Sequence, residues 1–377
     1  MKIKILDKYI FTELINPLLL GAAVFTLLFM SVDVFFRIAS MIVQKQLSMG
    51  DGMLCIYYNL PYILVFTFPM SVLLAMLVGF GRLSSDSEII AMKSGGISFY
   101  RIAVPAVILA GIVTIASFYM NERLSPEFTY RAKNIIAQTL TKEGAKIWEN
   151  ITLKTTTSDG LERIITAIKF NYKKGIMEGV MIQDSKGTKP VRWIRADLAV
   201  WEASQWYLVN ADVYNLDPDK PGEIKYQTHF KKYTSPIPYT PIDIENRERA
   251  PEEMSSINVQ EKINSLTADY KKNNSQDKDL FKQITGLKVM LHQKIAIPFT
   301  CLVFALIGIP LGIRPHRTST SIGLGLSIVF IFIYYILMSI GRALGENSIL
   351  PPAAASWMPN IIFASVGLFL LYKKGQN

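Results

Sequence analysis

Six long, predominantly apolar stretches constrain this chain more than any other feature of its sequence. A helix needs about 20 such residues to cross the roughly 30 Å hydrocarbon core of a bilayer. Backbone polar groups inside a bilayer must bond to one another, so a single stretch of this kind folds there as a helix. The sequence therefore predicts six transmembrane helices, at about Ile10–Phe36, Leu54–Phe80, Ile102–Met120, Ile295–Ile313, Ser321–Ile340 and Ala353–Tyr372.

A long polar region separates the first three stretches from the last three. Of the 377 residues, 50% are hydrophobic and 19% are charged. That is too apolar for an ordinary soluble protein and too charged for a fully embedded one. We therefore expect three transmembrane helices in residues 1–121, a folded polar domain with flanking helices in residues 122–287, and three transmembrane helices in residues 288–377.

Lysines and arginines gather in four segments that flank the apolar stretches. If the six helices alternate in direction, these segments share one side, which the positive-inside rule makes cytoplasmic. Both termini are then cytoplasmic and the polar domain lies outside the inner membrane. Residues 122–287 hold 25 Lys and Arg against 23 Asp and Glu, so most of the net charge of +10 lies in the membrane half, which favours anionic lipid over nucleic acid as a partner. The flanking cations are Lys2, Lys4, Lys8, Arg82, Lys93, Arg101, Arg314, Arg317, Lys373 and Lys374.

The polar domain changes its pattern along the chain. Residues 121–140 continue the preceding helix, and after Pro251 an apolar stripe predicts another helix. Between them, four segments rich in β-branched and aromatic residues predict strands: RIITAIKF, GVMIQ, VRWIRADLAVWE and QWYLVNADVYNL. Many short strands at this spacing favour an antiparallel sandwich or jelly roll. The helical stripe consists of Val259, Ile263, Leu266 and Tyr270.

The short polar segment Gly81–Arg101, between the second and third apolar stretches, carries helix signals of its own. Ser85 and Glu88 have the spacing of a capping box, and Gly95 with the glycine after it supplies a helix stop. We expect a short capped helix with exposed apolar residues that a partner could contact. A solvated connecting turn is the alternative interpretation. The apolar residues are Ile89, Ile90 and Met92.

Charged residues at the predicted outer ends of the helices form a second candidate site. Asp33 and Arg37 are four residues apart at the end of the first helix, and Lys288, Lys294 and Arg342 lie at the ends of the fourth and fifth. One interpretation is that they are ordinary anchors, since long basic side chains near helix ends reach for the interface. The other is an electropositive mouth suited to a phosphorylated amphiphile.

Several kinds of chemistry have no support in the sequence. It contains no G-x-x-x-x-G-K-[ST], so this chain cannot bind ATP through a P-loop. It contains no G-x-S-x-G or H-E-x-x-H, its three histidines are scattered, and Cys55 and Cys301 both lie in apolar stretches. We therefore expect no catalytic residues, no metal site, no cofactor and no disulfide in this chain.

Three segments together resemble the lipopolysaccharide-export permease family LptF/LptG (YjgP/YjgQ). They are RLSSDSEIIAMKSGGISFYRIAVP, LHQKIAIPFTCLVFALIGIPLGIRP and IYYILMSIGRALGENSILPPAAASWMPNIIF. The resemblance covers essentially the whole chain and is strongest in the membrane half. It implies a bacterial inner-membrane permease subunit that pairs with a second LptF/LptG-type subunit, without indicating whether the chain is of the F or G type or pairs with itself.

The resemblance also implies partners and roles. A separate LptB-type ATPase would bind ATP and magnesium, and residues 84–97 would be the coupling helix that it contacts, with Glu88 at the family's acidic position. Lipopolysaccharide would enter from the outer leaflet, near the region of Arg37, and pass through periplasmic jelly rolls to LptC- and LptA-type proteins. The other charged residues at helix ends are added from charge and topology alone.

Three alternatives compete with an export permease. A mechanotransmission subunit would move a periplasmic domain without carrying lipid, and would not co-purify with it. An ion-coupled transporter would need paired acidic residues near mid-bilayer, and the interiors of the second to sixth helices contain none. An intramembrane enzyme would need a nucleophile–base pair, which the sequence lacks.

Overall fold

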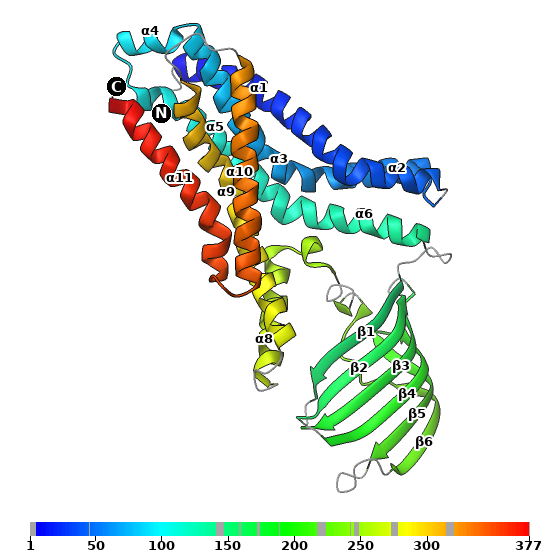
Figure 1. The fold of residues 1–377 in the computed structure, drawn as a ribbon. Coiled ribbons are helices and arrows are strands. Elements are labelled where there is room, and N and C mark those ends of the chain that lie inside the picture. Colours follow the sequence, from blue (N-terminus) through cyan, green and yellow to red (C-terminus); the bar gives the residue numbers. More distant parts are fainter. Residues whose placement is uncertain are drawn as a thin grey trace. The chain divides into compact units, whose positions relative to one another are not determined.

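A computed structural model describes the chain as two compact units. One unit is helical and combines Met1–Ala132 with Ala250–Asn377, and the other, Lys133–Arg249, is rich in strands (Figure 1). The predicted topology cations Lys2, Lys4, Arg314 and Arg317 lie outside the described residues. The described residues are 5–44, 46–140, 147–157, 160–171, 174–187, 189–216, 224–241, 243–244, 249–272, 278–313 and 320–376.

Helices make up nearly all of the first unit. The π-helical turns η1 (Ser31–Phe35) and η2 (Met120–Leu124) each join two α-helices, and η3 (Pro251–Glu253) is a single 3₁₀ turn. The α-helices are α1 (Ile5–Met30), α2 (Phe36–Val43), α3 (Met49–Ser85), α4 (Glu88–Ser94), α5 (Phe99–Tyr119), α6 (Ser125–Leu140), α8 (Ser256–Lys272), α9 (Lys278–Gly312), α10 (Thr320–Glu346) and α11 (Pro352–Gln376).

Six helices among the described residues are long and apolar enough to cross a membrane, as predicted from the sequence. Three precede the strands and three follow them. Three of them are much longer than the roughly 20 residues that a bilayer requires: α3 with 37 residues, the continuous stretch Phe99–Ile136 with 38 and α9 with 35. They therefore extend beyond the apolar stretches seen in the sequence.

The helices α3 and α9 form the centre of the helical unit. Close approach between them depends on Gly308 and Gly312, because a Cβ on Gly312 would lie 2.7 Å from the Met76 carbonyl oxygen. The Ile10 and Leu14 side chains of α1 are buried in the same core. Most of the remaining length of α1, like that of α10, presents apolar side chains outward, as a helix at a lipid or subunit boundary does.

A buried polar network joins α9, α10 and α11. The Thr300 and Tyr334 hydroxyl oxygens lie 2.6 Å apart, so one donates to the other, and both lie within hydrogen-bond distance of Oδ1 of Asn360, at 3.1 and 3.0 Å. The Asn360 amide donates to the Ala296 carbonyl at 2.8 Å. Because every member has a partner, the network can lie in an apolar interior without a large desolvation cost.

The second unit contains one six-stranded antiparallel sheet whose strands follow the chain order, β1-β2-β3-β4-β5-β6. The four segments predicted as strands fall on β2 to β5, which confirms them. The sequence did not predict β1 and β6. The strands are β1 (Ile147–Thr156), β2 (Glu162–Asn171), β3 (Ile176–Lys186), β4 (Lys189–Glu202), β5 (Gln205–Leu216) and β6 (Ile224–Thr234).

The chain after β6 packs against one face of this sheet. Ile237 and Ile244 join the apolar core that the strands line, and the Trp206 indole N–H donates to the Tyr239 carbonyl at 2.6 Å. A jelly roll has two sheets with Greek-key connections, whereas the described strands form one meander with this segment as its cover. The sheet topology therefore does not confirm the predicted jelly roll.

The strand-rich unit is narrower than the domain predicted for residues 122–287. The predicted stripe of α8 is confirmed, but it packs on α9, where Val259 and Ile263 are buried against Ile284. The Glu122 carboxylate accepts hydrogen bonds from the Ser256 amide and hydroxyl, the latter at 2.6 Å. These contacts place both ends of the predicted domain in the helical unit.

Candidate functional site

The short helix α4 occupies the segment between α3 and α5 and ends at the predicted glycines. The Gly96 N–H donates to the Lys93 carbonyl at 2.9 Å, and the Ile97 N–H donates to the Met92 carbonyl at 3.1 Å. These are the two hydrogen bonds of a Schellman motif. Gly96 has a φ of +80°, which glycine adopts without steric cost. The predicted helix stop is confirmed, and Gly95 is the C-cap residue of α4.

The predicted capping box between Ser85 and Glu88 is wrong. Ser85 is the last residue of α3, and its hydroxyl donates back to the Arg82 carbonyl at 2.9 Å. The N-cap of α4 is Ser87, so Glu88 is the first helical residue and not the third. Its carboxylate accepts a hydrogen bond from another helix. The S-x-x-E spacing therefore spans the junction between two helices.

The apolar residues of α4 divide between its two faces. Ile89 is 2% exposed and belongs to the core of the helical unit, whereas Ile90 is 56% exposed. Met92 is half-buried against the same core. The expectation that all three are exposed is wrong for Ile89, because the buried face holds α4 against the helical unit. Ile90 is the large apolar residue that α4 presents outward.

Three residues near the start of α1 contact the segment Gly81–Arg101, one at each of three places along it. Arg101, at the start of α5, donates from Nη2 to Oδ2 of Asp7 at 2.7 Å. The Tyr9 hydroxyl lies 2.9 and 2.8 Å from the two carboxylate oxygens of Glu88, on α4. Nη1 of Arg82, near the end of α3, lies 3.1 Å from Oε2 of Glu13. We call these three residues of α1, Asp7, Tyr9 and Glu13, the tethers, because their polar contacts join α1 to Gly81–Arg101.

The end of α11 meets the same region. Lys374 donates to the Ile313 carbonyl at 2.9 Å, and the Tyr100 side chain lies against the backbone of Gly375. Figure 1 shows α4 at the same end of the helical unit as the start of α1 and the end of α11. The described members of the predicted cytoplasmic cation set therefore share one end of the unit.

The first pair of charged residues at helix ends lies where α1 gives way to α2. Asp33 is inside the π-helical turn η1, and Arg37 follows on α2 with an exposed side chain. The prediction that they share a face assumed a continuous α-helix, which the π-turn replaces. Ile38 and Ile42 of α2 pack against Gly52 of α3, which fixes α2 on that helix.

Lys294 is not an open cation at a helix end. It is 7% exposed, and its ammonium donates to the Met254 carbonyl at 2.7 Å. Its own carbonyl accepts a hydrogen bond from the Asn121 amide at 2.7 Å. Lys294 therefore joins α9 to the segment before α8, and the prediction that it contributes to an accessible mouth is wrong in this conformation.

The other two cations are exposed. Lys288 lies on the surface of α9, and Arg342 of α10 forms an ion pair with Glu346, with Nε 2.7 Å from Oε1. Gly345 packs against Val289, so these two cations stand on neighbouring turns of adjacent helices. Arg37 lies on a different helix, packed on α3. The structure therefore brings together two of the predicted cations and not the whole set.

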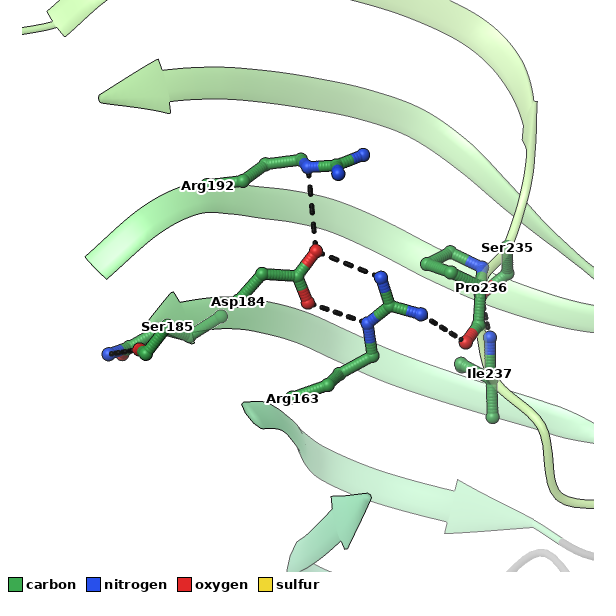
Figure 2. Close-up of polar contacts among 8 residues, drawn as sticks. Arg163, Asp184, Ser185, Arg192, Ser235, Pro236 and Ile237 are labelled. Carbon is green, nitrogen blue, oxygen red and sulfur yellow. Dashed lines mark hydrogen bonds and ion pairs between the residues drawn. The ribbon is translucent and has the colours of Figure 1, made fainter. Parts of the chain in front are cut away.

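The strand-rich unit holds a buried ionic cluster that the sequence did not predict (Figure 2). Asp184 of β3 is directly opposite Arg163 of β2 on one side and Arg192 of β4 on the other. Nε and Nη2 of Arg163 lie 2.6 and 2.9 Å from the two Asp184 oxygens, and Nε of Arg192 lies 3.4 Å from Oδ2. Arg163 also donates to the Pro236 carbonyl at 2.9 Å. The cluster therefore holds the segment after β6 against the sheet.

Elsewhere the described residues offer no site for a metal ion. Within the described ranges, no three His, Cys, Asp or Glu residues lie close enough to hold one. Cys55 and Cys301 are buried and free. His229 lies 2.9 Å from Asp212 on the exposed face of the sheet. The chemistry of the described residues is therefore that of ion pairing, helix packing and apolar burial.

Comparison with known proteins identifies one family. The family model described as lipopolysaccharide export system permease LptF/LptG matches residues 8–373, nearly the whole chain. A search of curated proteins found no match.

Proposed function

We propose that this chain, which belongs to the LptF/LptG family, is a permease subunit of an ABC transporter that extracts lipopolysaccharide from the outer leaflet of the inner membrane. The observation that carries the proposal is the family match over residues 8–373. Six helices able to span a membrane make the chain a multi-pass inner-membrane protein. We infer that both termini are cytoplasmic and that the strand-rich unit is periplasmic.

A separate LptB-type ATPase supplies the energy in this proposal and binds the ATP and magnesium. Extraction of a lipid from a bilayer is uphill, and this chain has no P-loop, so the work must reach it through a contact surface. We assign that surface to residues 84–97. Glu88 offers a carboxylate and Ile90 an exposed apolar side chain on this segment.

The lipid-contacting part of the chain must combine apolar surface with cations at headgroup depth, because a buried charge without a partner is costly. Exposed apolar side chains line α1 and α10. Arg37, Lys288 and Arg342 are exposed cations of the right sign for phosphate groups. We assign these three cations, with Asp33 beside the first, to the lipid path, and omit Lys294 because its ammonium is already bonded.

The remaining partners follow from the family role. A second LptF/LptG-type subunit would complete the membrane core, and the strand-rich unit would be the periplasmic domain that passes lipid to LptC- and LptA-type proteins. The apolar face of the six-stranded sheet suits such a domain, since it offers a surface for acyl chains where its cover is displaced.

The test is co-purification of the full chain with a tagged LptB-type ATPase and a second subunit, followed by identification of bound lipid. We expect ATPase and lipopolysaccharide to be recovered together with the wild-type chain. Glu88→Lys should lose the ATPase or uncouple hydrolysis from lipid extraction, while the same change at exposed Glu202 on the sheet should not. Recovery of ATPase without lipid would instead favour a mechanotransmission subunit.

A second measurement tests the lipid path itself. Charge reversal at Arg37 should reduce photo-cross-linking of lipopolysaccharide to neighbouring positions of α1 and α2. Arg131→Glu, which reverses a similarly exposed arginine paired with Glu127 on α6, is the matched control. Undiminished cross-linking in the Arg37→Glu chain would remove that residue from the path.

A further inference from the structure

We propose that the start of α1 is the element that carries movement of α4 into the membrane, and that Tyr9 is the positioning residue for this transmission. The inference rests on the proposed function, since it concerns how that contact surface is connected to the rest of the chain. It adds a route for the movement, through α1, and a positioning residue, Tyr9. Neither follows from contact between α4 and an ATPase alone.

Three polar contacts of α1 converge on Gly81–Arg101, the segment that contains α4. Asp7, Tyr9 and Glu13 are separated by two and four residues, so at 1.5 Å per residue they occupy about 9 Å of the helix. Each holds a different part of the segment: the start of α5 through Arg101, α4 through Glu88, and the end of α3. Three contacts within two turns fix the orientation of α1 against the segment as well as its position.

Of these three contacts, the one between Tyr9 and Glu88 reaches α4 itself. The contact spans 79 residues of sequence, so it is tertiary and depends on the packing of α1. A carboxylate has about four lone-pair sites. Glu88 can therefore hold the tyrosine hydroxyl and still accept a hydrogen bond from a cation of a partner. The contact can persist while an ATPase binds, as a transmitting contact must.

The packing of α1 suits a helix that moves. Its buried side chains include Ile10 and Leu14, close to the tethers, and Gly21 and Thr26 further along. Leu19, Leu27 and Leu28, by contrast, are more than half exposed. Along its length α1 is held on one face, where Gly21 packs on Ser71 and the Thr26 hydroxyl lies 3.1 Å from that of Thr67 of α3. A helix held on one face can tilt as a rod on its neighbour when its tethered end is displaced. The 26 residues of α1 extend about 39 Å.

The far end of α1 leads to a place where the helix can change its geometry. The π-helical turn η1 follows Met30 directly and connects α1 to α2, which carries Arg37. π-turns inside helices are rare and are frequently found at functional sites. Movement that begins at Tyr9 would therefore arrive beside one of the cations assigned to the lipid path.

The test compares Tyr9→Phe with the wild type in the reconstituted complex of two permease subunits and the ATPase. The change removes one hydroxyl and keeps the ring. We expect ATPase association and hydrolysis within about twofold of wild type, and lipopolysaccharide released per ATP lowered severalfold. Tyr372→Phe, at an exposed tyrosine of α11 at the same end of the unit, should leave this ratio unchanged. Tyr9→Arg, which can again donate to Glu88, should restore part of it.

A measurement on the full chain alone keeps the inference separate from the proposed function. Spin labels on cysteines introduced at exposed Ile5 and Ile90 report the distance between α1 and α4, because the native Cys55 and Cys301 are buried. Tyr9→Phe combined with Glu13→Gln should broaden the distance distribution. An unchanged distribution would overturn the tether, and an unchanged release ratio would overturn transmission through it. Failure of the wild-type chain to bind ATPase or lipid would overturn the proposed function instead.

Discussion

Arg163 and Asp184 form a two-point ion pair across β2 and β3, with Nε to Oδ1 at 2.6 Å and Nη2 to Oδ2 at 2.9 Å. The Asp184 side chain is 0% exposed and that of Arg163 is 8% exposed. Because Arg163 also donates to the Pro236 carbonyl, the pair connects the sheet to the segment that covers it. Removing one partner therefore affects both the charge balance and the cover of the sheet.

We expect Asp184→Ala to destabilise the strand-rich unit by about 3–5 kcal/mol, because it leaves a buried guanidinium without its counter-charge. Replacing both partners, as in Arg163→Met with Asp184→Leu, should cost clearly less, since the one cation left, Arg192, has a side chain that is 33% exposed and can be solvated. Thermal unfolding of the full chain in detergent can be followed by tryptophan fluorescence. Four of the five tryptophans, Trp148, Trp193, Trp201 and Trp206, lie in this unit, so the signal reports mainly on it.

The exposed pair of Lys232 and Glu202 is the control for this measurement. Its two side chains are 2.8 Å apart at the surface of the same sheet, and the hydrogen bond from Lys232 to the Glu202 carboxylate raises the pKa of the lysine. The pair is therefore intact at neutral pH, and the stability that it contributes is lost as the pH rises through that raised pKa of Lys232. We expect Glu202→Gln to change the unfolding temperature very little, because exposed pairs are screened by solvent. Equal losses for Asp184→Ala and Glu202→Gln would contradict the assignment of a buried cluster.

A second prediction concerns the contact between α3 and α9. In Gly312→Ala the added methyl group would lie 2.7 Å from the Met76 carbonyl oxygen and 2.8 Å from Cβ of Phe80, so backbone must move. Overpacking of this kind costs about 1–3 kcal/mol. Gly325→Ala makes the same change on α10 with no atom within 4 Å, and should be neutral or slightly stabilising. The apparent melting temperatures of the two purified variants decide the point, and a lower value for the Gly325→Ala protein would refute it.

A third prediction separates two lysines of α9 that the sequence does not distinguish. Lys294→Met keeps the length of the side chain but leaves the Met254 carbonyl without its donor, which should cost about 2 kcal/mol. Lys288→Met should not change stability, since Lys288 is exposed. Lipid cross-linking should show the opposite order, with a loss for Lys288→Glu. Equal stability of the two methionine variants would show that the Lys294 contact is dispensable.

The features that sequence predicted correctly are those that local pattern determines. Apolar stretches of sufficient length gave the six helices, and the stripe from Val259 to Tyr270 gave the buried face of α8. The adjacent glycines Gly95 and Gly96 correctly predicted where α4 ends. By contrast β6 is exposed along almost its whole length, so its strand structure comes from pairing with β5 and leaves no apolar alternation to detect.

The features that sequence missed depend on contacts between distant residues. Lys294 looks like any cation near a helix end, and its bond to Met254 depends on how α9 packs beside the segment before α8. The partners Arg163 and Asp184 are 21 residues apart and meet only because the strand register places them opposite each other. A charged residue at an inward position of an alternating strand, as Arg163 is in phase with the buried Ile165 and Ala167, is the signal that could have revealed the cluster.

The last prediction assigns different tasks to two adjacent residues of α4. Ile90→Asp should leave the fold intact and weaken association with the ATPase by about tenfold, the equivalent of about 1.4 kcal/mol, because an exposed apolar contact is replaced by a solvated charge. Ile89→Asp places the same charge in the core beside Leu83 and Phe99, where burial without a partner costs several kcal/mol. That variant should lose thermal stability before any partner is added. Binding of purified, folded protein to the immobilised ATPase, with melting temperatures measured in parallel, separates the two effects. If Ile90→Asp binds as tightly as wild type while Glu88→Lys does not, the contact surface of α4 is ionic, and the exposed isoleucine takes no part in it.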